Sequence, residues 1–339
     1  MALLRKTSAP LWTRQSFLIL ILLLALCFLS MAFGIATGSV DISLREVFTA
    51  MFNDDGTISS SVILELRLPR VISGFLVGGM LALAGALMQI LLRNPLAEPY
   101  VLGVSGGASV FALLAMITGL SGYWVNLGAF TGALLSMLLV FGLSHMGGSW
   151  SPMRVLLTGV VIASGWGALI NFLLAVSPSA RLQGMLFWLM GDLGYAGHPG
   201  FSALVLLLAT CLALFRARDL NLLIHGDLQA ASLGVAVGRL RYIIYFLSSL
   251  LTATAVMQAG GIGFIGLIIP HLVRLLFGSD HRMLIPVSVL LGGSLLVVSD
   301  GLARILISPQ QLPVGVLTAL LGVPLFLSLL HFSMRMQRP

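Results

Sequence analysis

Residues 260–271 read Gly-Gly-Ile-Gly-Phe-Ile-Gly-Leu-Ile-Ile-Pro-His and break an otherwise apolar stretch with glycine and proline. A second break lies in the first half of the chain, where Asn94-Pro-Leu-Ala-Glu-Pro99 is followed by Gly103-Val-Ser-Gly-Gly107. Interrupted apolar segments in corresponding halves of a membrane protein point to the substrate path of a transporter. The two breaks therefore predict a membrane protein that forms a translocation path.

The composition excludes an ordinary water-soluble globule. Of the 339 residues, 58% are hydrophobic and 9% are charged, a balance typical of polytopic membrane proteins. The apolar residues fall in segments of roughly 17 to 25, the length with which a helix crosses about 30 Å of hydrocarbon. No segment alternates as the strands of a membrane β-barrel do. We expect an all-α polytopic protein with a single transmembrane domain over residues 1–339.

Ten segments are expected to span the membrane. They cover Phe17–Ile35, Leu68–Leu92, Tyr100–Thr118, Trp124–Leu143, Met153–Val176, Phe201–Phe215, Leu240–Met257, Gly263–Phe277, Met283–Ile307 and Val314–Phe332. The first follows three basic residues in the manner of a signal peptide. Its length, and the spans behind it, favour a retained helix.

Basic residues predict the orientation, because connections rich in lysine and arginine stay in the cytoplasm. With ten spans both termini share one side, and that side holds thirteen of the eighteen lysines and arginines, namely Arg5, Lys6, Arg14, Arg93, Arg154, Arg216, Arg218, Arg239, Arg241, Arg274, Arg282, Arg335 and Arg338. We therefore expect both termini in the cytoplasm and a solvated periplasmic loop at residues 36–64. The basic residues never form a run with interleaved aromatic residues, so the expected surroundings are membrane lipids and not nucleic acid.

An internal repeat is suggested by aligning the region of Arg70 with that of Arg239. The alignment also pairs Met88 with Met257 and Gln89 with Gln258. The first arginine falls outside and the second inside, as two inverted halves require.

The cytoplasmic connection from Arg216 to Arg239 has too few apolar residues to span the membrane and too many for a plain linker. Gly226, Asp227 and Gly234 suggest that one short helix ends and another begins, with Asp227 as the N-cap and Gly234 after the last turn. Such a pair at the cytoplasmic face requires a protein surface on which to sit.

No pattern indicates catalytic, cofactor or metal chemistry. Cys27 and Cys211 lie in apolar segments and are expected to pack and not to form a disulfide. The six histidines lack metal-ligand spacing. The chain has one lysine, Lys6, and no G-x-x-x-x-G-K-[ST] loop, so ATP and its Mg²⁺ are expected to be bound by a partner.

Six motifs together resemble the permease subunit of bacterial ABC importers of the FecCD type. They are Arg67-Leu-Pro-Arg70, Gly85-Ala-Leu-Met-Gln89, Asn94-Pro-Leu-Ala-Glu-Pro99, Gly103-Val-Ser-Gly-Gly107, Gly263-Phe-Ile-Gly-Leu-Ile-Ile-Pro-His271 and Leu312-Pro-Val-Gly315. The resemblance covers about residues 15–335. It implies the type II ABC importer permease fold, with ten helices in two inverted-repeat halves, in the inner membrane of a bacterium. It also implies a homodimer or pseudodimer of permeases, two cytosolic ABC ATPase subunits and a periplasmic substrate-binding protein.

The resemblance places the docking of the binding protein on three periplasmic arginines, Arg67, Arg70 and Arg304. The alternative is structural: Arg67 and Arg70 mark a helix end, and Arg304 pairs with Asp300 one turn earlier. ATPase coupling falls on residues 220–235, and within them on Leu223, His225, Gly226, Asp227, Leu228, Gln229, Ala230, Leu233 and Gly234.

The cytoplasmic gate falls on Asn94, Pro95 and Leu96 and on Ser151, Pro152 and Met153. Pro152 and Met153 replace small hydroxyl residues found in some relatives, so the position of the gate carries over better than its chemistry. Asn94 also suits an ordinary turn before proline. Candidate pore residues are Met88, Gln89 and Gln258, although a glutamine in a span can instead bond between helices. Gly78 and Gly85 permit either close helix packing or a smooth pore wall.

An ion-gradient-driven secondary transporter is the rival interpretation, since it also uses broken helices. It would bury ionisable residues near the midplane. Among the acidic residues only Asp300 lies well inside an expected span, with Arg304 one turn away to neutralise it. An intramembrane hydrolase lacks its H-E-x-x-H or paired-aspartate signature. The sequence leaves open whether the cargo is a ferric siderophore, haem or cobalamin, and whether the permease dimer is homomeric.

Overall fold

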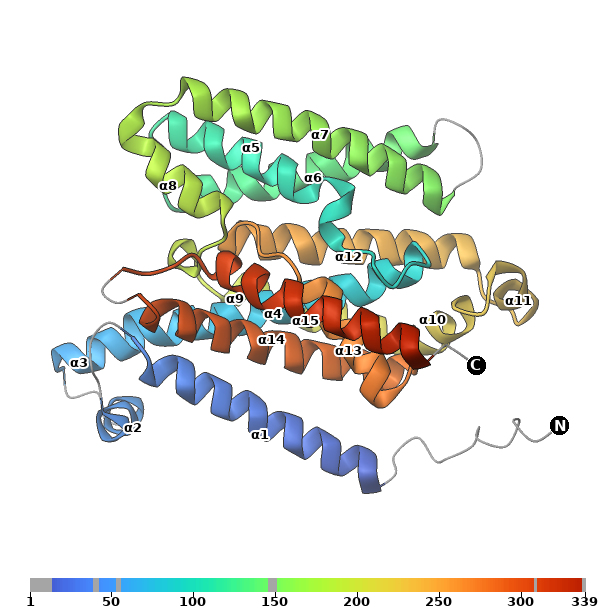
Figure 1. Cartoon of the computed structure of the whole chain (residues 1–339), viewed down its shortest axis with the longest axis horizontal. Helices are drawn as coiled ribbons and strands as arrows, with labels where there is room; N and C mark the ends of the chain where they lie inside the picture. The colour runs from blue at the N-terminus through green and yellow to red at the C-terminus, as the bar shows by residue number, and fades with distance from the viewer. Residues whose placement is uncertain (1–13, 39–42, 53–55, 146–150, 308–309, 337–339) are drawn as a thin grey trace.

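A computed structural model of the chain describes residues 14–38, 43–52, 56–145, 151–307 and 310–336 (Figure 1). Across these ranges the protein is helical, without a β-strand. The ten expected spans correspond to α1 (Arg14–Ala36), α4 (Leu68–Leu91), α5 (Val104–Ile117), α6 (Tyr123–His145), α7 (Pro152–Val176), α9 (Gly200–Phe215), α12 (Val237–Ala259), α13 (Ile265–Phe277), α14 (His281–Ile305) and α15 (Val314–Met336). The all-α prediction is confirmed, with helix ends within a few residues of those expected.

These ten helices differ in length. Six are long and apolar enough to cross a membrane, and α9 with the following α10 (Ala217–Leu223) forms a seventh candidate that is bent by 62°. The three shorter apolar helices are α5, α13 and α15. With 14 and 13 residues, α5 and α13 extend only about 20 Å, against about 30 Å of hydrocarbon. The glycine- and proline-rich breaks before them must supply the rest of the crossing.

Several helices were not predicted from the sequence. The outer connection contains α2 (Leu44–Phe52), α3 (Ile58–Ser61) and one π-helical turn, η1 (Val62–Arg67), that continues into α4; parts of the expected 36–64 loop lie outside the described residues. Between α7 and α9 lie α8 (Ser179–Leu189) and a 3-10 turn, η3 (Leu193–Tyr195). The apolar residues of α8 include the buried Met185 and Trp188. Because α8 is too short to span, its hydropathy alone resembles that of a loop.

The core is built around α4, which packs against α12, α13 and α14. In the continuous helical stretch Ile58–Leu91, 83% of the most apolar window is buried. Glycines allow its close contacts: a Cβ atom on Gly78 would lie 2.2 Å from the Gly292 oxygen, and one on Gly85 would lie 1.9 Å from the Gly266 oxygen. Of the two roles that the sequence left for these glycines, the structure shows close helix packing.

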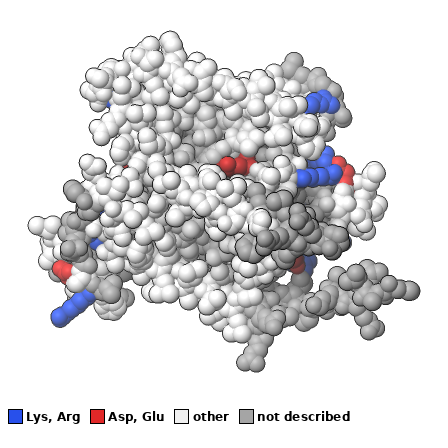
Figure 2. Space-filling model, in the orientation of Figure 1, with Lys and Arg blue, Asp and Glu red and all other residues white. Residues whose placement is uncertain are grey.

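The helices run along the long axis of the molecule, so its two ends differ in content (Figure 1). At one end lie α10, α11 (Asp227–Ser232), the start of α7, the first turn of α1 and the last turn of α15; at the other lie α2 and α3. Figure 2 shows few charged side chains on the face between the ends, apart from one acidic patch near its centre, and more of them near the ends. This distribution is expected of a protein whose middle lies in hydrocarbon.

Candidate functional site

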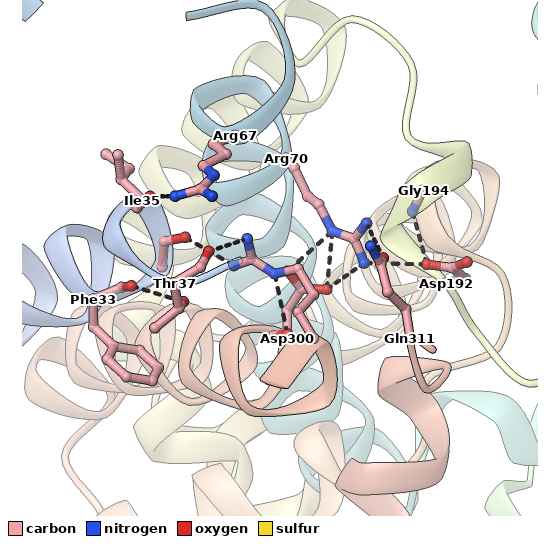
Figure 3. A network of polar contacts seen from close by, with 11 residues as sticks. Phe33, Ile35, Thr37, Arg67, Arg70, Asp192, Gly194, Asp300 and Gln311 are labelled. Carbon is pink, nitrogen blue, oxygen red and sulfur yellow. Dashed lines mark hydrogen bonds and ion pairs between the residues drawn. The ribbon is translucent and has the colours of Figure 1, made fainter. Parts of the chain in front are cut away.

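At the α2–α3 end, two buried arginines bind the last carbonyl groups of α1 (Figure 3). Arg67 donates from Nη1 to the Ile35 and Ala36 oxygens at 3.0 and 3.1 Å. Arg304 donates to the Gly34 and Thr37 oxygens at 2.8 and 2.7 Å. A helix C-terminus leaves carbonyls without partners and carries partial negative charge, so cations bind well there. The two guanidinium groups thus cap α1 and attach it to α4 and α14.

The same cluster contains an ion-paired carboxylate, Asp300, whose side chain is 2% exposed. It accepts hydrogen bonds from Arg70 Nε and Nη2 at 3.1 and 2.9 Å, and lies 3.1 Å from Arg304 Nε. Arg70 Nη2 also lies 3.4 Å from Asp192 Oδ1, and Arg70 Nη1 donates a hydrogen bond to Gln311 Oε1. The expected pairing of Arg304 with Asp300 is therefore present, and a second arginine shares the carboxylate.

A pocket of about 350 Å³ opens over this cluster and is lined by all three arginines expected to dock a binding protein. Arg67 and Arg304 are 6% and 4% exposed and bind backbone carbonyls. Arg70 retains 16% exposure of its side chain. Docking stays a prediction for the three residues, and the geometry favours Arg70 as the group that an incoming carboxylate reaches.

The two breaks that the sequence singled out meet inside the subunit. Glu98 Oε1 accepts a hydrogen bond from the Phe264 N–H at 2.9 Å, and the Tyr100 hydroxyl accepts one from the Ile262 N–H at 3.1 Å. Phe264 has φ +71°, a left-handed conformation that is uncommon outside glycine, and α13 begins at the next residue. The Glu98 carboxylate therefore lies at the N-terminus of α13, where negative charge is favourable. Irregular backbone at membrane depth requires such internal partners.

The proposed gate consists of two segments at the α11 end. Asn94 forms a closed turn: its Oδ1 accepts from the Leu96 N–H at 2.9 Å and its carbonyl from the Ala97 N–H at 3.0 Å. In the second segment Ser151 precedes α7 and Pro152 begins it. Both segments present an exposed apolar side chain, Leu96 at 45% and Met153 at 63%. Apolar side chains suit a gate that excludes water, and the gate itself stays a prediction.

The connection from Arg216 to Arg239, which is expected in the cytoplasm, forms two short helices, as the sequence predicted. α10 ends at Leu223, α11 runs from Asp227 to Ser232, and Gly234 has φ +85° after its last turn. The predicted N-cap is wrong, because Gly226 holds that position with φ +115°. Asp227 instead forms ion pairs with Arg93 and with Arg241, the latter at 2.6 Å. Two strong cationic partners outcompete the backbone amides of a six-residue helix.

The coupling residues divide into an inner and an outer set. Leu223 and Ala230 are buried against the subunit. Leu228 is 90% exposed and Leu233 55% exposed, and His225 and Gln229 are exposed beside them. A leucine so exposed on a short helix at this end of the molecule leaves an apolar contact available for a partner.

The three candidate pore residues lie inside the subunit. Met88 is 1% exposed and receives a bond from the Ser248 hydroxyl. Gln89 donates to the Gly266 and Leu267 oxygens, and Gln258 bonds to Gly197, His198 and Ser202. Within the subunit, both glutamines therefore bond between segments, which is the alternative to facing a pore that the sequence left open.

The sequence predicted α7 as a span but not its exposure: only 11% of its apolar window is buried, the smallest share among the six long spans. Its outer face mixes apolar residues with Ser164 and Asn171, both exposed. Trp166 attaches α7 to the rest of the subunit through a 2.9 Å bond to Ser136. A polar face on a membrane helix requires a water-filled cavity or a partner. The sequence contained a signal for this face, because Ser164 and Asn171 are seven residues apart and so lie on the same side of a helix.

Sequence comparisons find relatives over nearly the whole chain. The FecCD transport family matches residues 22–332. The hemin transport system permease protein HmuU of Yersinia pestis is 40% identical, with 92% of this chain and 93% of the relative covered. The vitamin B12 import system permease protein BtuC of Vibrio vulnificus is 38% identical, with 84% and 87% covered.

A solved structure is also similar. It is described as an inward-facing conformation of a metal-chelate type ABC transporter, and it is 32% identical with a TM-score of 0.81. The match covers 92% of this chain and 98% of that one.

Proposed function

The chain belongs to the FecCD transport family as the permease subunit of an ABC importer, and from this premise we propose that it carries an iron complex, such as a ferric siderophore or haem, or cobalamin, from periplasm to cytoplasm. The similar proteins named for hemin, vitamin B12 and metal chelates support this class of bulky, chelated cargo. A ferric complex is the first choice among them.

The observation that carries the proposal is the exposed helix α11 beside the gate turn. Leu228 offers an apolar anchor, and the Asp227 ion pairs fix the helix to the subunit. Each copy of the permease is expected to place this helix on one of two cytosolic ABC ATPase subunits. Those subunits bind ATP and Mg²⁺, while this chain is no enzyme and binds no cofactor. A periplasmic binding protein delivers the cargo at the opposite end.

A second copy of the permease completes the path. The exposed face of α7, with Ser164 and Asn171, has the mixed character of a helix that borders a pore. A homodimer would place two such faces opposite each other. In the inner membrane, with both termini in the cytoplasm, α11 meets the ATPase and the arginine cluster faces the periplasm.

The rival ion-driven mechanism requires a carboxylate that exchanges protons or sodium. Asp300 is held between Arg70 and Arg304. Its two cationic partners occupy both of its oxygens. This arrangement supports a structural role for Asp300 and an energy source outside the permease.

The test is ATPase activity and cargo uptake in proteoliposomes that contain the permease, its genomic-neighbour ATPase and its binding protein, loaded in turn with ferric siderophore, haem or cobalamin. We expect one loaded binding protein to stimulate ATP hydrolysis and uptake. Arg70→Gln should reduce the stimulation, whereas Arg45→Gln, a change at an exposed arginine outside the cluster, should not. Uptake that needs an ion gradient and ignores ATP would overturn the proposal.

A further inference from the structure

The Arg93–Glu98 segment joins α11 to α13, and both of its ends are held by a charged side chain. At one end Arg93 Nη2 pairs with Asp227 Oδ1 of α11. At the other, Glu98 Oε1 accepts the Phe264 N–H at 2.9 Å. The segment therefore connects the cytoplasmic helix pair to the break that precedes α13.

The connecting segment is rigid enough to transmit a displacement. Its turn is closed twice, by the Asn94 side chain to the Leu96 N–H and by the Asn94 carbonyl to the Ala97 N–H. The Asn94 N–H itself bonds to the Gln89 oxygen at 3.2 Å, which holds the turn on the end of α4. Proline at positions 95 and 99 further restricts the backbone.

Both ends also carry unusual backbone conformation. Among the described residues other than glycine, positive φ occurs at Arg93, with +50°, and Phe264, with +71°. Such conformations persist where the surroundings hold them, and they concentrate at switch regions. Here each lies at one of the two charged contacts, Arg93 beside Asp227 and Phe264 beside Glu98.

We propose that Asp227, Arg93 and Glu98 are positioning residues that transmit movement of α11 through the Asn94 turn to the start of α13. When the ATPase moves α11, the ion pair displaces Arg93 and the closed turn shifts as one body. Glu98 then displaces Phe264. The Phe264 side chain packs closely on Gly322 of α15, where an added Cβ atom would lie 2.7 Å from it. One displacement thus reaches α13 and α15. This proposal rests on the proposed function.

A double-mutant cycle in the reconstituted complex tests the connection. The variants are Arg93→Gln, Glu98→Ala and their combination, and the measured quantity is cargo imported per ATP hydrolysed. We expect each single variant to lower this ratio about tenfold, a typical size for coupling between sites. If both act in one connection, the double variant is no worse than the poorer single variant. A loss of about a hundredfold, the product of two independent tenfold effects, would overturn the proposal.

Matched variants separate transmission from folding. Glu98→Gln keeps an oxygen that accepts the Phe264 N–H and should retain the wild-type ratio. Asp219→Asn removes an ion pair at the same end of the molecule, in which Asp219 lies 3.2 Å from Arg216. This pair is not part of the connection, so the variant should also retain the wild-type ratio. Arg93 is exposed, so Arg93→Gln should assemble normally even if Glu98→Ala does not.

The outcomes distinguish the two proposals. If wild-type complex shows no ATP-driven uptake, the proposed function fails. If wild-type complex is active and Arg93→Gln keeps its ratio of cargo to ATP, the connection alone is refuted.

Discussion

Arg67 and Arg304 hold the same helix end from two sides. Arg67 binds the oxygens of Ile35 and Ala36, and Arg304 binds those of Gly34 and Thr37. Only 22% of the apolar window of α1 is buried in the subunit. The carbonyl bonds therefore add to the packing of α1 against α14 and α4, and they give both arginines a structural role at the α2–α3 end of the molecule.

Replacing either arginine should loosen α1. Arg304→Met removes two bonds to carbonyls and the ion pair with Asp300, and hydrogen bonds to charged groups contribute about 1.5–3 kcal/mol each. We expect a fall in the thermal unfolding midpoint of the detergent-solubilised protein, larger for Arg304→Met than for Arg67→Met. Arg45→Met, at an exposed arginine, is the control; an equal fall there would contradict the assignment.

Neutralising Asp300 should destabilise the subunit. Asp300→Asn leaves the buried Arg304 and the nearly buried Arg70 without their shared carboxylate. Breaking a buried ion pair by removing one partner costs about 3–5 kcal/mol. Denaturant unfolding followed by tryptophan fluorescence measures the loss. Asp192→Asn should cost less, because Asp192 is 20% exposed and lies 3.4 Å from Arg70; the reverse order would refute the ranking.

The contact between α4 and α13 should not tolerate a methyl group. In Gly85→Ala the new Cβ atom would lie 1.9 Å from the Gly266 oxygen, so one helix must move. Overpacking in a dense core costs about 1–3 kcal/mol. Gly142→Ala meets nothing within 4 Å and should be neutral or slightly stabilising. The comparison is made by thermal unfolding, and similar midpoints for the two variants would show that the contact can relax.

A charge on the outer face of α11 should release the ATPase. Leu228 is 90% exposed, so Leu228→Asp should leave the permease folded. An aspartate in an apolar contact loses its hydration, and we expect at least a tenfold weaker association in co-purification with the ATPase, about 1.4 kcal/mol. Leu228→Met keeps the apolar contact and should bind normally. Unchanged binding by Leu228→Asp would place the ATPase contact elsewhere.

The sequence predicted the spanning segments because hydropathy and length are properties of each segment by itself. It also predicted the two short helices α10 and α11 from Gly226 and Gly234, whose positive φ values are allowed by glycine's lack of a side chain. It placed Asp227 at the N-cap, whereas Arg93 and Arg241 hold the carboxylate. Arg93 follows the end of α4 and Arg241 lies in α12. The sequence around Asp227 cannot show that the fold brings these two arginines to it.

The candidate site shows the same division. Hydropathy and motif pattern alone predicted an all-helical polytopic membrane protein with two broken apolar segments, and they offered the Asp300–Arg304 ion pair as the alternative to docking. The packing of distant segments sets three further contacts: Glu98 meets Phe264, Gln89 and Gln258 bond between segments, and Arg67 and Arg304 cap α1. The physical reason is range: partition into hydrocarbon acts on each segment alone, whereas the partner of a buried polar group depends on which distant segment the packing brings within 3 Å of it.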